Sequence, residues 1–188
     1  MKLTKRHALL ISVLAILMAL CTIAGATLAY LFVKTGEVKN TFAPSNIGLT
    51  LTETPADYKM IPGVDIAKDP KVTVTNDVAC YVFVKVVEST NFDTYMTYEM
   101  ADGWIALNGV SGVYYREVPA GTYATAKEFP VIKGNIVTVP DTVTKDQMNL
   151  LYNADGTVKT DAQPTLTFTA YAFQKEGFTP AEAWAELN

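Results

Sequence analysis

Residues 164–173 read PTLTFTAYAF, and this stretch decides the fold class of the chain. Its apolar and polar side chains alternate with a period of two, which places successive side chains on opposite faces of a β-strand. The first face carries four apolar side chains: Leu166, Phe168, Ala170 and Ala172. The second face carries three threonines and Tyr171. The stretch therefore predicts a strand that rests one face on a hydrophobic core.

The same alternation recurs at residues 47–52 and 71–75. Residues 80–87 are apolar at every position except Lys85, which predicts a central strand that is covered on both faces. Shorter strands are predicted at four further places: residues 104–107, 112–118, 129–132 and 135–139. Pro130 places the third of these at a sheet edge, because proline cannot donate to a β-ladder. We therefore expect an all-β fold, an antiparallel β-sandwich of jelly-roll type.

Two short helices are predicted near the C-terminus. Thr144 and Gln147 have the spacing of a capping box, in which each side chain bonds the backbone N–H of the other residue. Residues 179–182 read TPAE, with a capping threonine and a proline in the first helical position. The apolar face of this second helix includes Trp184, which we expect to pack against the sheet.

The first 29 residues have the order of a secretory signal peptide. Lys2, Lys5 and Arg6 precede an uncharged stretch at residues 8–29, which ends in small side chains. Cleavage after Ala26 or after Ala29 agrees with this order. We favour the second, which makes Tyr30 the new N-terminus. The protein is then secreted, to the extracellular space or the cell surface.

A retained membrane anchor is the alternative. The apolar run continues to Val33 and is long enough to cross a hydrocarbon core, which needs about 20 residues. However, Gly25 and its small neighbours interrupt the run where cleavage is expected. We therefore expect contact with the membrane only before cleavage.

The charge and the histidine content of the chain exclude several classes of partner and of catalysis. The chain has 19 acidic and 15 basic residues, and the signal removes three basic residues and no acidic one. Such an acidic domain argues against nucleic acid or anionic lipid as a partner. The single histidine, His7, lies within the signal, so the exported part has no His-based catalysis and no His-ligated zinc. We expect no enzymatic activity, no catalytic residue, no metal site and no cofactor.

Four other features admit a structural and a functional interpretation. Cys80 remains alone after cleavage, and we expect a buried, inert thiol. A calcium site is conceivable at Asp65, Asp69 and Asp77, although solvated turn residues explain these aspartates equally well. A pair flanking a glycosidic bond is conceivable among Glu99, Asp102 and Glu117. The middle of the chain is rich in aromatic side chains, which could form a face that stacks against a glycan. We favour packing in the core for these residues: Tyr81, Tyr95, Tyr98, Trp104, Tyr114, Tyr115 and Tyr123.

Several stretches together resemble the TasA/camelysin family of secreted biofilm-matrix proteins. No single motif carries the resemblance; the order of the stretches does. They are residues 26–30, 38–42, 47–54, 61–63, 68–76, 166–173 and 181–184.

The resemblance implies cleavage by a dedicated signal peptidase, a jelly-roll sandwich, and extracellular fibres built from many copies of the chain. In such fibres the N-terminal segment of one subunit completes the sheet of the next, which is β-strand addition. Here residues 30–43 are the candidate donor strand, and residues 44–188 are the sandwich domain. The side chains expected to make the assembly contacts are Leu31, Phe32, Val33, Val38 and Phe42. Some members of the family carry a metalloprotease label, which the missing histidines argue against here.

Two alternative functions stay open at this point. One is a monomeric cell-surface binding module for a glycan or a protein ligand. The other is a hydrolase that uses carboxylates alone.

Overall fold

The computed structural model describes residues 45–54 and 58–187, which belong to the compact unit Pro44–Asn188. Several predicted features lie outside the described residues: the signal peptide, the cleavage positions Ala26, Ala29 and Tyr30, and the assembly positions Leu31, Phe32, Val33, Val38 and Phe42. Within the described part, no helix has the length and apolar character needed to cross a membrane.

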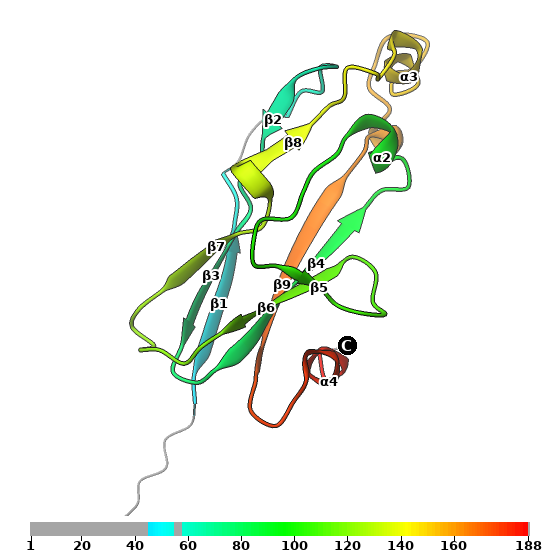
Figure 1. Cartoon of the computed structure of the whole chain (residues 1–188). Coiled ribbons are helices and arrows are strands. Elements are labelled where there is room, and N and C mark those ends of the chain that lie inside the picture. The colour runs from blue at the N-terminus through cyan, green and yellow to red at the C-terminus, as the bar shows by residue number, and fades with distance from the viewer. Residues whose placement is uncertain (1–44, 55–57, 188) are drawn as a thin grey trace, which may run out of the picture. The chain divides into compact units, whose positions relative to one another are not determined.

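A three-stranded antiparallel sheet forms one layer (Figure 1). Its strand order is β1 (Ile47–Thr52), β3 (Lys71–Asn76) and β7 (Lys127–Pro130). In the central strand, Val72 and Val74 are fully buried, whereas Lys71, Thr73 and Thr75, which alternate with them, are only half-buried. This pattern is what the period-2 alternation predicts for a sheet with one face on the core.

A four-stranded antiparallel sheet forms the second layer. Its order is β5 (Ile105–Ala106), β6 (Val113–Val118), β4 (Cys80–Glu88) and β9 (Leu166–Gln174). The prediction that residues 80–87 form a covered central strand is confirmed. Val82 and Val84 face the other sheet, and Tyr81 and Phe83 are buried on the opposite face.

The main core lies between the two sheets. Its buried members are Val72, Val74, Cys80, Val82, Val84, Val86, Ala101, Trp104, Val118 and Val131. Leu166, Phe168, Ala170 and Ala172 of β9 pack against it, as their alternation predicts. The all-β sandwich is therefore confirmed, while its jelly-roll connectivity stays a prediction. Cys80 is fully buried, and this burial raises the pKa of its thiol.

A second core lies under a small two-stranded sheet of β2 (Asp65–Ala67) and β8 (Ile136–Thr138). The helices α2 (Phe92–Tyr95) and α3 (Lys145–Asn149) lie at the same end of the molecule (Figure 1). The buried members are Phe92, Tyr95, Met96, Ile132, Val137, Val139, Val143 and Leu151. The sequence did not predict β2 or α2, because a three-residue strand and a single helical turn are too short to show a period.

Helix α4 (Pro180–Ala185) covers the far face of the four-stranded sheet, as predicted for Trp184. The Trp184 ring lies 5.4 Å from the Phe83 ring and 5.2 Å from the Tyr171 ring, between centroids. The predicted capping box of Thr144 and Gln147 is present, and the predicted cap Thr179 forms a capping box with Glu182.

One strand prediction was shifted along the chain. Residues 129–132 were expected to form a strand, but β7 ends at Pro130, and Val131 and Ile132 belong to buried loop backbone. Both side chains are buried between elements, and Ile132 forms only an isolated antiparallel bridge with Met100. The edge position predicted from Pro130 is confirmed, because β7 pairs only with β3 among the described strands.

Candidate functional site

The outer edge of β9 is the most distinctive open feature of the fold. All nine residues of β9 pair with β4, and among the described strands none pairs with the other side of β9. An edge strand presents a row of unpaired backbone N–H and C=O groups to any further strand. β1, at the edge of the facing sheet, lies beside β9 without pairing with it. Two unpaired strand edges therefore meet on one side of the sandwich.

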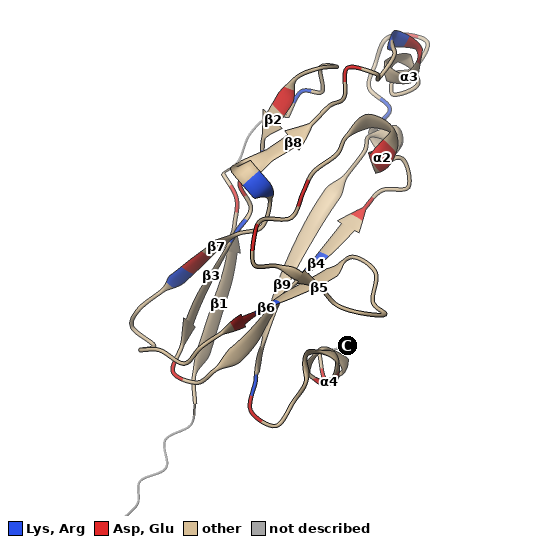
Figure 2. Ribbon diagram, in the orientation of Figure 1, with Lys and Arg blue, Asp and Glu red and all other residues tan. Residues whose placement is uncertain are grey.

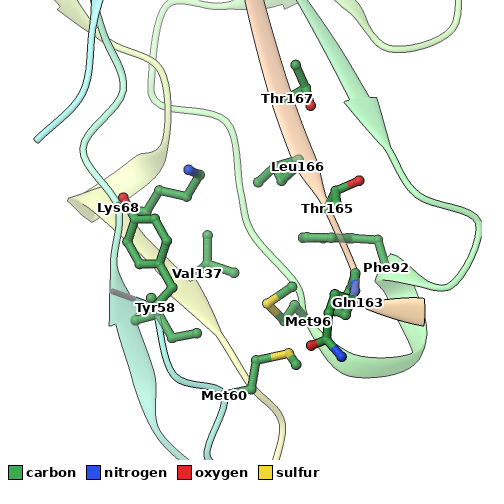
Figure 3. A pocket seen from close by; sticks show the side chains of 12 residues that line it. Tyr58, Met60, Lys68, Phe92, Met96, Val137, Gln163, Thr165, Leu166 and Thr167 are labelled. Carbon is green, nitrogen blue, oxygen red and sulfur yellow. The ribbon is translucent and has the colours of Figure 1, made fainter. Parts of the chain in front are cut away.

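A hollow of about 550 Å³ lies beside the first residues of β9 (Figure 3). Its apolar lining comes from β2, β8, β9, α2 and the connections next to them: Met60, Ile66, Phe92, Met96, Val137 and Leu166. Figure 3 shows the sulfur atoms of Met60 and Met96 turned towards the cavity. Methionine side chains are flexible and polarizable, so they adapt to apolar groups of different shapes.

A smaller hollow of about 300 Å³ follows along the same strand. It shares Leu166 and Thr167 with the larger one and adds Leu51 at the end of β1 and Phe168 on β9. Together the two hollows form a groove that follows the first part of the β9 edge. We call this the β9 groove.

A charged network lies where the two hollows meet. The Lys68 ammonium is 2.6 Å from Oε1 of Glu53, and the hydroxyl of Tyr58 donates a hydrogen bond to the same carboxylate oxygen. The Lys68 Nζ also lies 4.8 Å from the centre of the Tyr58 ring and 5.7 Å from that of Phe168. Only 13 % of the Lys68 side chain is exposed. Partial burial and the bond to Glu53 raise the pKa of Tyr58 to about 12.

As lined by the described residues, the β9 groove is mainly apolar, with one charged side chain in each hollow. Lys68 is the one charged side chain among the described residues that line the larger hollow, and Glu53 is the one in the smaller. The amide of Gln163 donates to the backbone carbonyls of Leu151 and Lys159, so it is held in place. An extended chain can gain backbone hydrogen bonds from the strand edge, and its apolar side chains can fill the hollows.

The aspartates considered for calcium lie apart and are engaged separately. Asp65 accepts from the Thr138 hydroxyl, Asp69 from the backbone and hydroxyl of Thr54, and Asp77 from the backbone of Asn46. The bonds from Thr54 lower the pKa of Asp69. Across the described ranges, no three His, Cys, Asp or Glu side chains are grouped to hold a metal ion. In the described part of the chain, the three aspartates therefore make separate hydrogen bonds with different partners.

The carboxylates considered for glycoside hydrolysis form surface ion pairs. Glu99 lies 2.6 Å from Lys133, and Glu117 pairs with Lys175. The hydrogen bond from Lys133 lowers the pKa of Glu99, which is opposite to the shift that a general acid needs. The hydrogen bond to Glu99 and, to a smaller extent, the negative charge of Asp102 raise the pKa of Lys133.

Most of the aromatic side chains considered for glycan stacking are buried or half-buried in the domain. Tyr81, Tyr95 and Trp104 are buried, and each donates a hydrogen bond to a backbone carbonyl. Tyr98, Tyr114 and Tyr115 are half-buried, and Tyr123 is 45 % exposed. These rings therefore do not build one open stacking face. Sequence reasoning missed the β9 groove, because Tyr58, Met60 and Lys68 lie in connections that carry no periodic pattern.

Comparison of the chain with protein-family models, with curated proteins and with solved structures gave no match.

Proposed function

We propose that the protein is a secreted, non-enzymatic structural subunit of an extracellular fibre or biofilm matrix, in which residues 30–43 of one copy add as a strand to the β9 edge of the next. The observation that supports this most is the composition of that edge. β9 is nine residues long and contains no charged residue and no proline. Natural edge strands normally carry charges, prolines or bulges that prevent pairing with another chain.

The β9 groove supports the same proposal from the side chains. A strand that paired with β9 would place alternate side chains over the two hollows, and apolar residues there would lose their contact with water. The candidate donor segment supplies apolar residues on both faces of an extended strand: Leu31 and Val33 on one face, and Phe32, Val38 and Phe42 on the other. Extended, its 14 residues reach about 46 Å, whereas β9 spans about 30 Å.

The point where the described chain begins and the position of the proposed acceptor groove favour a filament. The described chain enters β1 at the end of the sandwich opposite to β2, β8 and α2, which border the larger hollow (Figure 1). A contact between opposite ends of identical subunits is heterologous. Such contacts propagate as open filaments unless the rotation between subunits closes a ring.

Export and processing complete the proposal. Removal of residues 1–29 by a signal peptidase would release the donor segment from the membrane and permit assembly outside the cell. The resemblance to the TasA/camelysin family implies the same sequence of events.

The test compares two purified chains. We expect residues 30–188 to form filaments visible by negative-stain electron microscopy, and residues 44–188 to stay monomeric. Filaments of equal length and number from the shorter chain would contradict strand donation.

The size of the larger hollow favours a second function, a monomeric cell-surface binding module. Its volume of about 550 Å³ is within the range of ligand pockets. Binding on a glycan or peptide array by residues 30–188 that remain monomeric at high concentration would support this alternative over the fibre.

A further inference from the structure

We propose that Lys68 determines which strand the β9 groove accepts, by requiring a carboxylate on the incoming chain, and that Glu37 of a second copy supplies it. This inference rests on the proposed strand donation and adds the charge that selects the donor.

Lys68 is placed where an incoming strand must lie. Its ammonium sits between Tyr58 and Phe168 of β9, at the junction of the two hollows, and its side chain is already largely shielded from water. A strand added beside β9 would shield it further. A cation removed from water needs a carboxylate partner, because an unpaired buried charge is strongly unfavourable.

In the single subunit Glu53 fills this role. The carboxylate of Glu53 follows the end of β1, accepts from both Lys68 and Tyr58, and keeps 29 % of its side chain exposed. Because the Glu53 side chain remains partly exposed to solvent, a second carboxylate can take its place beside Lys68. Glu53 is therefore the internal stand-in for the donor carboxylate.

The donor segment carries one acidic residue, Glu37, among residues 30–43. Leu31, Val33 and Glu37 are separated by even numbers of residues, so they share one face of an extended strand. That face combines the apolar Leu31 and Val33 with the carboxylate of Glu37 and the ammonium of Lys39. The β9 groove combines apolar hollows with the ammonium of Lys68 and the carboxylate of Glu53. The charges and the apolar groups of donor and groove are complementary.

A strand that lacks the carboxylate, or carries a cation in its place, is then disfavoured. Lysine at position 37 would bring a second positive charge to Lys68 in a site of low water content. Selectivity of this kind relies on repulsion of the wrong partner as well as attraction of the right one.

The experiment uses the exported chain, residues 30–188, and measures the rate of filament growth by light scattering, checked by electron microscopy. We expect Glu37→Lys to slow growth about tenfold or more, and Glu37→Gln to slow it less. Lys68→Glu should slow growth as well. The two charge reversals together, E37K and K68E in one chain, should restore most of the wild-type rate.

A matched control reverses the charge of a lysine that does not line the groove. Lys145 is exposed at the start of α3, so E37K combined with K145E should grow as slowly as E37K alone. Circular dichroism checks that each variant is folded. If K68E is unfolded, E37K and E37Q decide the question alone, because residue 37 lies outside the sandwich domain.

Growth of E37K and E37Q at the wild-type rate would overturn the role of Glu37 while leaving strand donation intact. Restoration by K145E as much as by K68E would overturn the assignment of Lys68. An absence of filaments from the wild-type chain would instead contradict the proposed function itself.

Discussion

Two edges of the same sandwich differ in how they meet solvent. β7, at one edge of the three-stranded sheet, reads KEFP and carries a lysine, a glutamate and a proline in four residues. β9, at one edge of the four-stranded sheet, carries none of these in nine. Figure 2 shows β9 without charge, whereas β7 bears both signs.

The charged side chains of β7 also form hydrogen bonds and an ion pair with neighbouring residues. Lys127 donates to the side chain of Asn76 and to the carbonyl of Pro119, and Glu128 pairs with Lys71 at 2.9 Å. Adding a strand to β7 would require these groups to lose water or partners. The edge at β7 is therefore protected against pairing with a further strand, whereas the edge at β9 is open. A filament that grows by adding a strand at one edge of each subunit needs this difference.

The strongest test of this asymmetry converts β9 into an edge like β7. Thr167 and Thr169 are exposed on β9, and replacing both by lysine places charges on the proposed acceptor. We expect filaments to be lost completely, because the lysines would have to be desolvated when the donor pairs. The measurement is electron microscopy of residues 30–188, with Glu128→Thr on β7 as the matched variant. Filaments from the double lysine variant would refute β9 as the acceptor.

A smaller effect is expected from the polar bonds that hold β7. Asn76 is fully buried and donates to the carbonyls of Val78 and Pro119. Asn76→Ala removes both of these bonds and one of the two acceptors of Lys127, so we expect the free energy of unfolding to fall by about 2 kcal/mol. Urea unfolding measures this, with exposed Asn149→Ala as the control. A loss equal to that of the control would show that Asn76 does not stabilise this edge.

The helix that covers the back of the four-stranded sheet should affect stability without affecting assembly. Thr179→Ala removes the capping box of α4, which we expect to cost about 1 kcal/mol in unfolding free energy. Filament growth of the folded variant should be unchanged, because α4 lies on the far face of the sheet. Thr144→Ala, which removes the cap of α3, is the matched variant. A change in growth rate specific to Thr179→Ala would contradict this separation.

The smallest effect is a pH dependence at the β9 groove. The pKa of Tyr58 is raised from about 10 to about 12, so the folded state holds the phenol proton more tightly than the unfolded chain. The resulting stability is complete below pH 10 and is lost as the pH rises through 12. Phenolate absorbance should show one tyrosine fewer titrating near pH 12 in Tyr58→Phe. An identical titration curve in the variant would contradict the contact with Glu53.

The sequence predicted the parts of the fold that have a period. The alternation at residues 164–173, the apolar run at residues 80–87 and the helix caps at Thr144 and Thr179 involve neighbours along the chain. Local interactions therefore determine their structure. The β9 groove brings together Tyr58, Lys68 and Phe168 from three segments. No spacing in the sequence relates them, so only the packed sheets reveal the site.

The same reasoning explains two weaker predictions. The apolar side chains of Val131 and Ile132 suggested a strand, because burial in a loop and burial in a strand need the same residue types. The acidic residues suggested sites, because the sequence does not show that Glu99 and Glu117 each lie beside a lysine.

Strand addition at the β9 edge is tested most directly by amide hydrogen exchange, measured residue by residue in filaments and in monomeric residues 44–188. We expect exchange to slow in filaments at the outward-facing amides of β9, while the amides of β7 exchange equally in both forms. Unchanged exchange in β9, or new protection in β7, would contradict it.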